Sequence, residues 1–299
     1  MNSVKVRVPA TTANLGPGFD ALGMALGLYN EVELALADET AVEISGEGET
    51  TLPRDNRHLI LRSAQQLADE AGKTVSGWRL SQVNRIPLAR GMGSSSAAIV
   101  GGLVAANELL QTGLSREALL DLAARIEGHP DNVAPAIYGG LTVCCANETL
   151  CCLPLPAPCL RIILAIPDFE VSTEAARKVM PKEIPHSDGV FNSMHVAMVV
   201  ASLAAGRYDL LGCGMRDKLH QPYRAHLVPG FEQVITAALD AGAYAAALSG
   251  SGPTMAAFAD ESENQIAAAM CEAFLTAGVE CKTLAVPVDA EGATVLCAE

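Results

Sequence analysis

The chain has 299 residues, half of them hydrophobic, and a formal net charge of −14. This length is enough for two domains or one large one, and the hydrophobic share excludes wholesale disorder. The acidic balance argues against non-specific binding to nucleic acids and to anionic membrane surfaces, because both require basic patches on the protein.

The N-terminal residues predict a strand and no targeting segment. Residues 4–8 alternate valines with basic residues, which is typical of a half-buried strand, and Pro9 is expected to end it. The longest uninterrupted apolar stretch, near residues 97–106, is too short to span a membrane. Nine cysteines without C-x-x-C spacing are expected to be buried, reduced thiols rather than metal ligands. We therefore expect a cytoplasmic protein.

The next part of the chain predicts a sheet with one helix. Residues 10–20 are rich in turn formers and carry Asn14 and Asp20, so a loop is expected there. Strands are predicted where apolar residues alternate or cluster, and a helix where they recur at helical spacing before a glycine. The predicted strands cover residues 32–36, 42–44 and 78–80, and the predicted helix runs from Leu59 to Ala71 with Gly72 as its stop.

The stretch Pro87-Leu-Ala-Arg-Gly-Met-Gly-Ser-Ser-Ser-Ala-Ala98 predicts a phosphate-binding loop that leads into a buried helix. Gly91 and Gly93 permit a sharp turn and close approach of a ligand, and Ser94–Ser96 are candidate N-cap residues. A helix N-terminus favours anions because its N–H groups and dipole point outward. The stretch matches neither the usual P-loop nor G-x-G-x-x-G. Taken alone, it is equally compatible with a connector that only caps a helix.

A second helix is predicted from Arg116 to Glu127, capped by Ser115 and stopped by Gly128. Glu127 then lies in the last turn, where the helix dipole does not favour a carboxylate. Such a side chain is either solvated or bound to a cation. The following residues 129–135 contain two prolines and several polar side chains, and they predict a rigid turn.

The second half of the chain predicts alternating strands and helices. The alternating prolines of residues 153–158 predict an extended junction, which divides the chain into domains 1–155 and 156–299. A mixed α+β architecture is therefore expected. The predicted strands lie near residues 139–144 and 161–166, a strand–loop–strand unit covers 243–258, and the predicted helices cover 172–180, 191–205, 230–241 and 262–277.

Three separated motifs resemble those of the GHMP kinase superfamily, which includes galactokinases and mevalonate kinases. They are P-A-T-T-A-N-L-G-P-G-F-D at residues 9–20, the loop at 87–96, and S-G-S-G-P-T at 249–254. The resemblance runs through nearly the whole chain. It implies a two-domain α+β fold, with an N-terminal half similar to ribosomal protein S5 domain 2 and a ferredoxin-like C-terminal half. It also implies a left-handed β-α-β crossover, which is unusual for parallel strands.

Within the superfamily, four segments are most similar to the members that phosphorylate L-homoserine. These segments cover residues 13–20, 127–135, 172–177 and 222–230. The resemblance implies transfer of the γ-phosphate of ATP to the homoserine hydroxyl, a step of threonine biosynthesis. A mevalonate-type kinase and a non-catalytic sensor on the same fold are the alternatives. The run Asp55-Asn-Arg-His58 departs from the D-x-x-N of the family, which leaves the adenine contacts open.

The resemblance also implies a set of site residues, and it implies a homodimer. Mg²⁺ would be held by Ser95 and Glu127, and Arg177 and Arg224 would clamp the substrate carboxylate. Asn132 would orient the hydroxyl, with Asp131 or His129 as base unless none is needed. The residues implied for ATP are Pro87, Arg90, Gly91, Met92, Gly93, Ser94, Ser95, Ser96 and Ala97. The remaining residues implied for the substrate are Asn14 and Asp20 for the ammonium group, Thr173 and Gly250.

Overall fold

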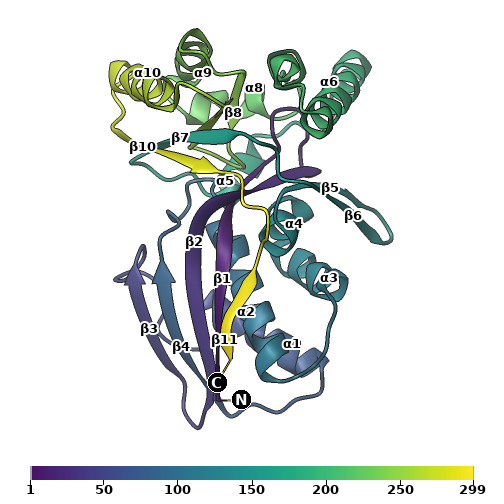
Figure 1. The fold of residues 1–299 in the computed structure, drawn as a ribbon, viewed down its shortest axis with the longest axis vertical. Coiled ribbons are helices and arrows are strands. Elements are labelled where there is room, and N and C mark those ends of the chain that lie inside the picture. The colour runs from purple at the N-terminus through teal and green to yellow at the C-terminus, as the bar shows by residue number, and fades with distance from the viewer. Residues whose placement is uncertain (1, 299) are drawn as a thin grey trace.

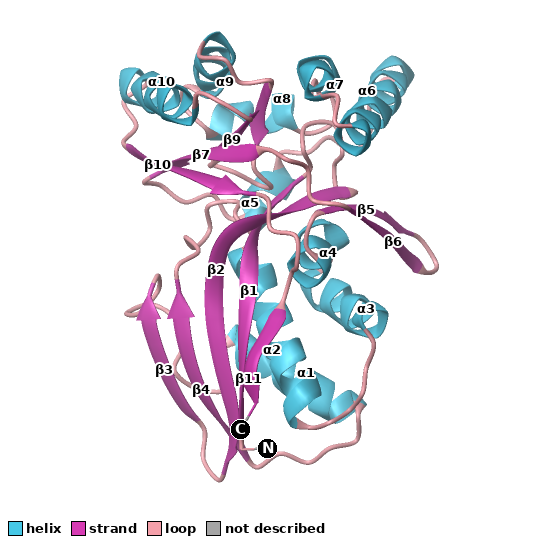
Figure 2. Cartoon of the chain, in the orientation of Figure 1, coloured by secondary structure: helices cyan, strands magenta, loops and turns pink. Residues whose placement is uncertain are grey.

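The computed structural model describes residues 2–298 and places two sheets one above the other, with helices packed against both (Figures 1 and 2). The elements of the lower part are β1 (Ser3–Ala13), β2 (Leu22–Ala37), β3 (Ala41–Gly46), α1 (Leu59–Glu70), β4 (Gly77–Asn84), α2 (Ser94–Leu109), α3 (Arg116–Glu127), α4 (Pro130–Tyr138), β5 (Leu141–Ala146) and β6 (Leu150–Leu155). The helices of this part lie on one side of its sheet.

The elements of the upper part follow a short connector. They are β7 (Arg161–Pro167), α5 (Thr173–Lys178), α6 (His186–Ala205), α7 (Leu211–Gly214), α8 (Gln221–Arg224), α9 (Phe231–Asp240), β8 (Ala245–Leu248), β9 (Met255–Ala259), α10 (Glu263–Thr276) and β10 (Cys281–Pro287). Two short 3-10 turns, 208–210 and 225–227, connect helices. The last strand, β11 (Thr294–Ala298), returns to the lower sheet and pairs with β1.

The lower sheet has seven strands, with the order β11-β1-β2-β4-β3; β5 pairs with β2, and β6 pairs with β5. The long β2 pairs with β1 along one edge, and along its other edge its first residues pair with β5 and its later ones with β4. β3 and β4 are parallel and are joined through α1. The family resemblance implies a β-α-β connection of this kind, and the left-handedness of the crossover stays a prediction.

The upper sheet has the order β10-β7-β9-β8, and all its neighbours are antiparallel. Numbered within this part, the order is 4-1-3-2 with helices between strands one and two and between three and four, which is the ferredoxin-like arrangement. The predicted α+β fold class is therefore confirmed. The predicted division at residues 155 and 156 stays a prediction, and β11 crosses it because it pairs in the lower sheet.

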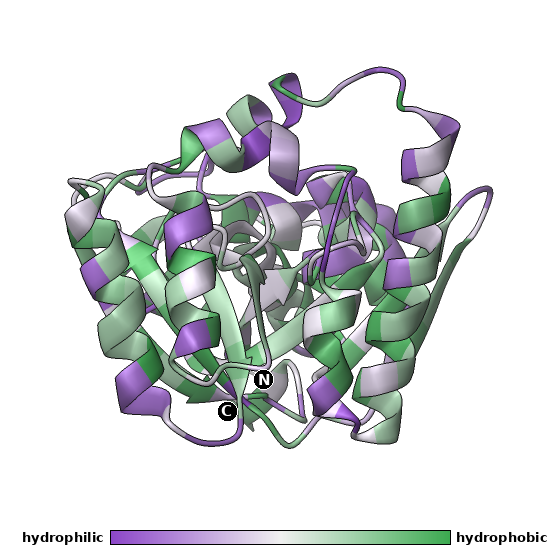
Figure 3. Cartoon of the chain, turned by 90° about the horizontal axis from the view of Figure 1, so that it is seen from above, coloured by the Kyte–Doolittle hydropathy of each residue, from purple (hydrophilic) through white to green (hydrophobic). Residues whose placement is uncertain are grey.

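The hydrophobic core runs continuously between the two parts. Ile162 and Leu164 of β7 belong to the same buried cluster as the strands of the lower sheet. Ile163 and Ala165, on the opposite face of β7, pack with the residues of α9 and α10. Alternate side chains of a strand point to opposite faces, so β7 is covered on both. Figure 3 shows the same distribution, with green hydrophobic residues on the strands and purple residues on loops and helix ends.

Most of the predicted elements are confirmed, and the wrong predictions described next are informative. β1 does not end at Pro9 but continues to Ala13, with a register shift between Pro9 and Ala10. Such an irregularity accommodates a proline, which cannot donate to the ladder. Residues 153–155 belong to β6 rather than to a linker, because they pair with β5.

The predicted rigid turn after Gly128 is instead the helix α4. Pro130 is its first residue, a position at which the missing N–H of proline is not needed. His129 is the N-cap, and the helix is almost completely buried. The two prolines in these nine residues are common turn formers, and for that reason the sequence predicted a turn instead of a helix.

Another wrong prediction concerns the cysteines. All nine are free, as expected, but only Cys144 is buried; three are half-buried and the other five are exposed. The exposed ones are Cys145, Cys151, Cys159, Cys213 and Cys297. Burial was therefore the wrong inference for most of them.

The helix α6 begins one turn earlier than predicted and is largely exposed. By length and composition alone it could cross a membrane, and it is the one such helix within residues 2–298. A single helix of this kind is weak evidence, because apolar helices of other protein classes pass the same test.

Candidate active site

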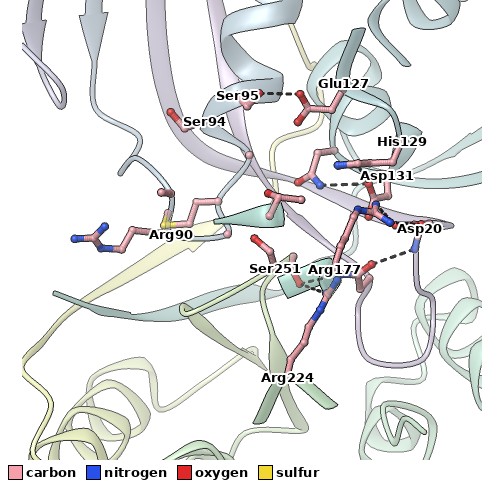
Figure 4. A pocket seen from close by; sticks show the side chains of 18 residues that line it. Asp20, Arg90, Ser94, Ser95, Glu127, His129, Asp131, Arg177, Arg224 and Ser251 are labelled. Carbon is pink, nitrogen blue, oxygen red and sulfur yellow. Dashed lines mark hydrogen bonds and ion pairs between the residues drawn. The ribbon is translucent and has the colours of Figure 1, made fainter. Parts of the chain in front are cut away.

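A cavity of about 100 Å³ between the two parts collects most of the site residues that the sequence predicted (Figure 4). Ser95 and Glu127 lie at one end of it, Arg177 and Arg224 at the other, and Asp131 between them. Its lining includes Asn14, Asp20, Arg90, Gly91, Met92, Gly93, Ser94, Ser95, Glu127, His129, Asp131, Asn132, Thr173, Arg177, Arg224 and Gly250. Ala89 and Ser251 also line it, without having been predicted.

The glycine–serine loop before α2 is held from both sides. Thr11 of β1 donates its backbone N–H to Met92 O at 3.1 Å, and Ser249 Oγ donates to Gly91 O at 2.7 Å. Ser249 belongs to the late S-G-S-G-P-T motif, so two motifs distant in sequence meet here. A Cβ on Gly91 would lie 2.2 Å from Ser249 O. Only glycine allows this close packing.

We expect Gly91→Ala to destabilise the protein far more than Gly113→Ala. The two glycines have φ values of 71° and 69°, so alanine carries a similar backbone cost of about 1–2 kcal/mol at either position. Only at Gly91 would the new Cβ meet backbone atoms, whereas nothing lies within 4 Å of a Cβ at Gly113. The clash adds roughly 1–3 kcal/mol. Denaturant unfolding of both variants measures the difference, and equal midpoints would contradict the close packing of the two motifs.

The N-terminus of α2 faces the cavity with free backbone donors. Its N-cap is Gly93, at φ 69°, so the prediction that a serine caps the helix is wrong. The three serines form the first turn instead. Ala97 N–H donates to Gly93 O, whereas within residues 2–298 no protein acceptor takes the N–H groups of Ser94–Ser96. These donors and the helix dipole favour an anion at this end of the cavity.

Glu127 lies beside this turn and accepts a hydrogen bond on each carboxylate oxygen. Ser95 Oγ donates to Oε2 and Ser96 Oγ to Oε1, both at 2.8 Å. Ser95 and Glu127 line the cavity, whereas Ser96 is fully buried behind them. One carboxylate and one exposed hydroxyl at an anion-binding loop form a donor set that suits a hard divalent cation. No cluster of three or more His, Cys, Asp or Glu side chains within residues 2–298 could hold a metal alone.

Asp131 organises the middle of the cavity from the first turn of α4. Its Oδ1 lies 2.6 Å from His129 Nδ1 and accepts from Asn132 Nδ2 at 3.3 Å. Asn132 Oδ1 in turn accepts from Thr11 Oγ1 at 2.8 Å. Burial lowers the pKa of His129, but the hydrogen bond to Asp131 and the charges of Asp131 and Glu127 outweigh it, so this pKa is raised. Thr11 was not predicted, although it lies within the first motif.

Asp20 and Arg177 form a bidentate ion pair at the far end. Arg177 Nη2 donates to Asp20 Oδ1 at 2.8 Å and Nη1 to Oδ2 at 3.1 Å. Both side chains are more than a third exposed. The arginine predicted for a carboxylate is thus paired with the aspartate predicted for an ammonium group. An ion pair of this exposure contributes only about 0–1 kcal/mol, so a ligand with both charges can replace it at little cost.

Arg224 is 2% exposed, and its Nε and Nη1 groups are hydrogen-bonded. Its guanidinium donates to Ala176 O at 3.1 Å and to Gly250 O at 3.2 Å. Gly250 O also accepts from Asn14 Nδ2 at 2.9 Å, and Asn14 Oδ1 accepts from the backbone N–H of Asp20. Burial and the neighbouring charge of Arg177 lower the pKa of Arg224. This chain of bonds joins the first and last motifs around the far end of the cavity.

Phe19 and His220 support the two arginines and were missed by the sequence analysis. The ring of Phe19 lies 5.1 Å from the guanidinium carbon of Arg224 and 5.6 Å from that of Arg177. His220 stacks on Phe19 and is completely buried, which lowers its pKa. Its Nε2 donates to Gly16 O at 2.7 Å. Phe19 belongs to the first motif, which was the available signal.

Four residues predicted for the nucleotide have side chains that are bound elsewhere or lie outside the cavity. Arg90 donates to the carbonyls of Pro167, Leu88 and Asp168 at 2.7–3.0 Å and thereby ties the loop to β7. Pro87, Ser96 and Ala97 do not line the cavity. His58 lies outside it as well, as the buried N-cap of α1.

Comparison with known proteins agrees with these motifs. A family model described as the GHMP kinases N-terminal domain matches residues 58–140, and one described as GHMP kinases C-terminal matches residues 199–275. A homoserine kinase from Carboxydothermus hydrogenoformans is 46% identical over 292 residues, covering 97% of this chain and 96% of the relative.

Solved structures show the same similarity. The crystal structure of homoserine kinase from Cytophaga hutchinsonii is 34% identical with a TM-score of 0.89, and the match covers 99% of this chain and 98% of that one. The phosphomevalonate kinase of Streptococcus pneumoniae shares the fold at 14% identity, with a TM-score of 0.72 and coverage of 95% and 100%.

Proposed function

Because this chain belongs to the GHMP kinase family, we propose that it transfers the γ-phosphate of ATP to the side-chain hydroxyl of L-homoserine. One observation carries the proposal: a single cavity joins an anion-binding helix N-terminus to a pair of arginines with an aspartate. The first end suits a triphosphate, and the second suits an amino acid with its two opposite charges. The product, O-phospho-L-homoserine, would serve threonine biosynthesis.

The triphosphate would bind at the first turn of α2. The unbonded N–H groups of Ser94–Ser96 would donate to phosphate oxygens. Ser95 and Glu127 would hold Mg²⁺, a fit that their hydroxyl and carboxylate support. When bound, the ion would neutralise part of the negative charge on the β- and γ-phosphates. Local positive groups, rather than the net charge of −14, decide whether a polyanion binds here.

Homoserine would bind at the opposite end of the cavity. Its carboxylate would take the place of Asp20 on Arg177, and its ammonium group would bind the released Asp20 carboxylate. Arg224 would keep the Gly250 carbonyl in place while its charge favours the substrate carboxylate. Thr173, exposed at the start of α5, completes this end.

The hydroxyl would then lie near Asp131 and Asn132. Asn132 has one amide hydrogen left after its bond to Asp131, and this hydrogen can orient the hydroxyl oxygen. Asp131 is positioned to accept the hydroxyl proton, with His129 sharing its Oδ1 oxygen. Because phosphoryl transfer depends mainly on positioning and charge neutralisation, the proton acceptor contributes less than the loop and the ion.

The test is an ADP-release assay with purified protein, ATP and Mg²⁺ against L-homoserine, mevalonate and galactose. Release of ADP only with homoserine supports the proposal. Release with mevalonate or galactose instead would show another small-alcohol kinase, and tight homoserine binding without any ADP would favour a sensor. Homodimer formation and a cytoplasmic location stay predictions.

A further inference from the structure

The β5–β6 hairpin places four cysteines directly opposite one another. Cys144 of β5 pairs with Cys152 of β6, and Cys145 pairs with Cys151. Successive side chains of a strand point to opposite faces. The two pairs therefore lie on opposite faces of the hairpin, Cys144 and Cys152 inward and Cys145 and Cys151 outward, as their exposure confirms.

Backbone hydrogen bonding shows which pair is closer. Cys144 N–H donates to Ala21 O at 2.8 Å, in the direction of β2, so the backbone groups of Cys144 point away from β6. Toward β6, Cys144 and Cys152 therefore form a pair without backbone hydrogen bonds. In such antiparallel pairs the Cα atoms are about 4.5 Å apart and the side chains are closer than in the alternating hydrogen-bonded pairs. That separation lies inside the range that a disulfide spans.

The two inward thiols differ in acidity. The interaction with Cys144 lowers the pKa of Cys152 despite the opposing effect of burial, whereas the interaction with Cys152, burial and the charge of Asp131 raise the pKa of Cys144. Cys152 is half-buried and thus reachable, while Cys144 is 5% exposed. The pair thus combines an accessible, more acidic thiol with a protected one directly behind it.

We propose that Cys144 and Cys152 form a reversible dithiol–disulfide site, oxidised by a low-molecular-weight disulfide. The Cys152 thiolate attacks one sulfur of the oxidant and releases one thiolate, leaving a mixed disulfide on Cys152. Cys144 then gives its proton to the released thiolate and attacks Cys152 Sγ, which releases the second thiolate. Two protein thiols and one disulfide thus give one protein disulfide and two small thiols.

The site lies against α4 rather than in the cavity. Cys144 belongs to the buried cluster that includes Val133 and Ile137 of α4, and neither cysteine lines the cavity. A bond between these two residues would lock the hairpin on which α4 packs. Formation of this disulfide does not depend on the proposed kinase activity, since it requires only the hairpin. With two thiols and no third ligand within residues 2–298, this is a redox site rather than a metal site.

The experiment uses the reduced full-length protein, incubated with glutathione disulfide and then alkylated. Digestion with an endoproteinase that cleaves after glutamate cuts at Glu148, between the two strands. Under non-reducing conditions we expect mass spectrometry to find the two hairpin peptides joined, and dithiothreitol to separate them.

Paired variants identify the cysteines. Replacing Cys145 and Cys151 with alanine should leave the cross-link intact, whereas replacing Cys144 and Cys152 should abolish it. Cys144→Ala alone should leave Cys152 as a glutathione adduct, because the resolving thiol is missing. The proposal is overturned if the oxidised wild-type protein shows no cross-link, or if the cross-link survives loss of Cys144 and Cys152. Circular dichroism confirms that each variant is folded.

Discussion

Replacing Glu127 with glutamine is expected to lower kcat by on the order of 10²- to 10³-fold, the loss found when one charge-stabilising group leaves an active site. Glutamine preserves the shape and still offers an acceptor to Ser95 or Ser96. What it removes is the negative charge that would hold Mg²⁺. The loss should therefore be partly recovered at high Mg²⁺ concentration. Steady-state kinetics over a series of Mg²⁺ concentrations measures both effects.

The matched control for Glu127 lies on the same helix. Glu117 is exposed in the first turn of α3, far from the cavity lining, so Glu117→Gln should leave kcat and its Mg²⁺ dependence unchanged. If Glu127→Gln retained wild-type kcat at every Mg²⁺ concentration, Glu127 would have no role in binding the ion.

Arg224→Ala is expected to raise the KM for homoserine by on the order of 10²-fold while changing the KM for ATP little. Removing a buried charged donor typically costs about 2–5 kcal/mol, because its partners remain buried and unpaired. Here the carbonyl of Ala176 would lose this donor, and the carbonyl of Gly250 would keep only its bond from Asn14. Gly250 lines the end of the cavity at which we propose that homoserine binds, whereas the α2 N-terminus is held by Thr11 and Ser249 instead. Kinetics with each substrate varied in turn separates the two effects.

Two further variants make this result interpretable. Arg207 is exposed and, among residues 2–298, forms an ion pair only with Asp209, so Arg207→Ala should change neither KM. Arg224→Lys retains the charge but loses the planar guanidinium, so its KM for homoserine should lie between those of the wild type and Arg224→Ala. Equal increases in the KM for both substrates, in a variant whose thermal unfolding is unchanged, would contradict the assignment of Arg224 to the homoserine end.

The sequence correctly predicted the helices and strands whose limits depend on residues close together along the chain. The helix 116–127 was delimited correctly because a serine cap and a glycine stop are local signals. The strand at 161–166 was recognised from its continuous apolar run. Local signals also misled: Pro130 and Pro135 suggested a turn, although a proline at the first position of a helix is favourable.

The motifs determined the family and which residue types would meet in one site, and only the tertiary structure decided how each side chain is engaged. Arg177 and Asp20 are 157 positions apart, and Arg224 and Gly250 meet across two elements. The opposition of Cys144 and Cys152 depends on a hairpin whose first strand was predicted and whose second strand ends in residues that were assigned to the junction 153–158. Residue spacing reports contacts within one helix or strand, whereas these bonds depend on how separate elements pack. That packing, set by the shared core, is absent from any local pattern.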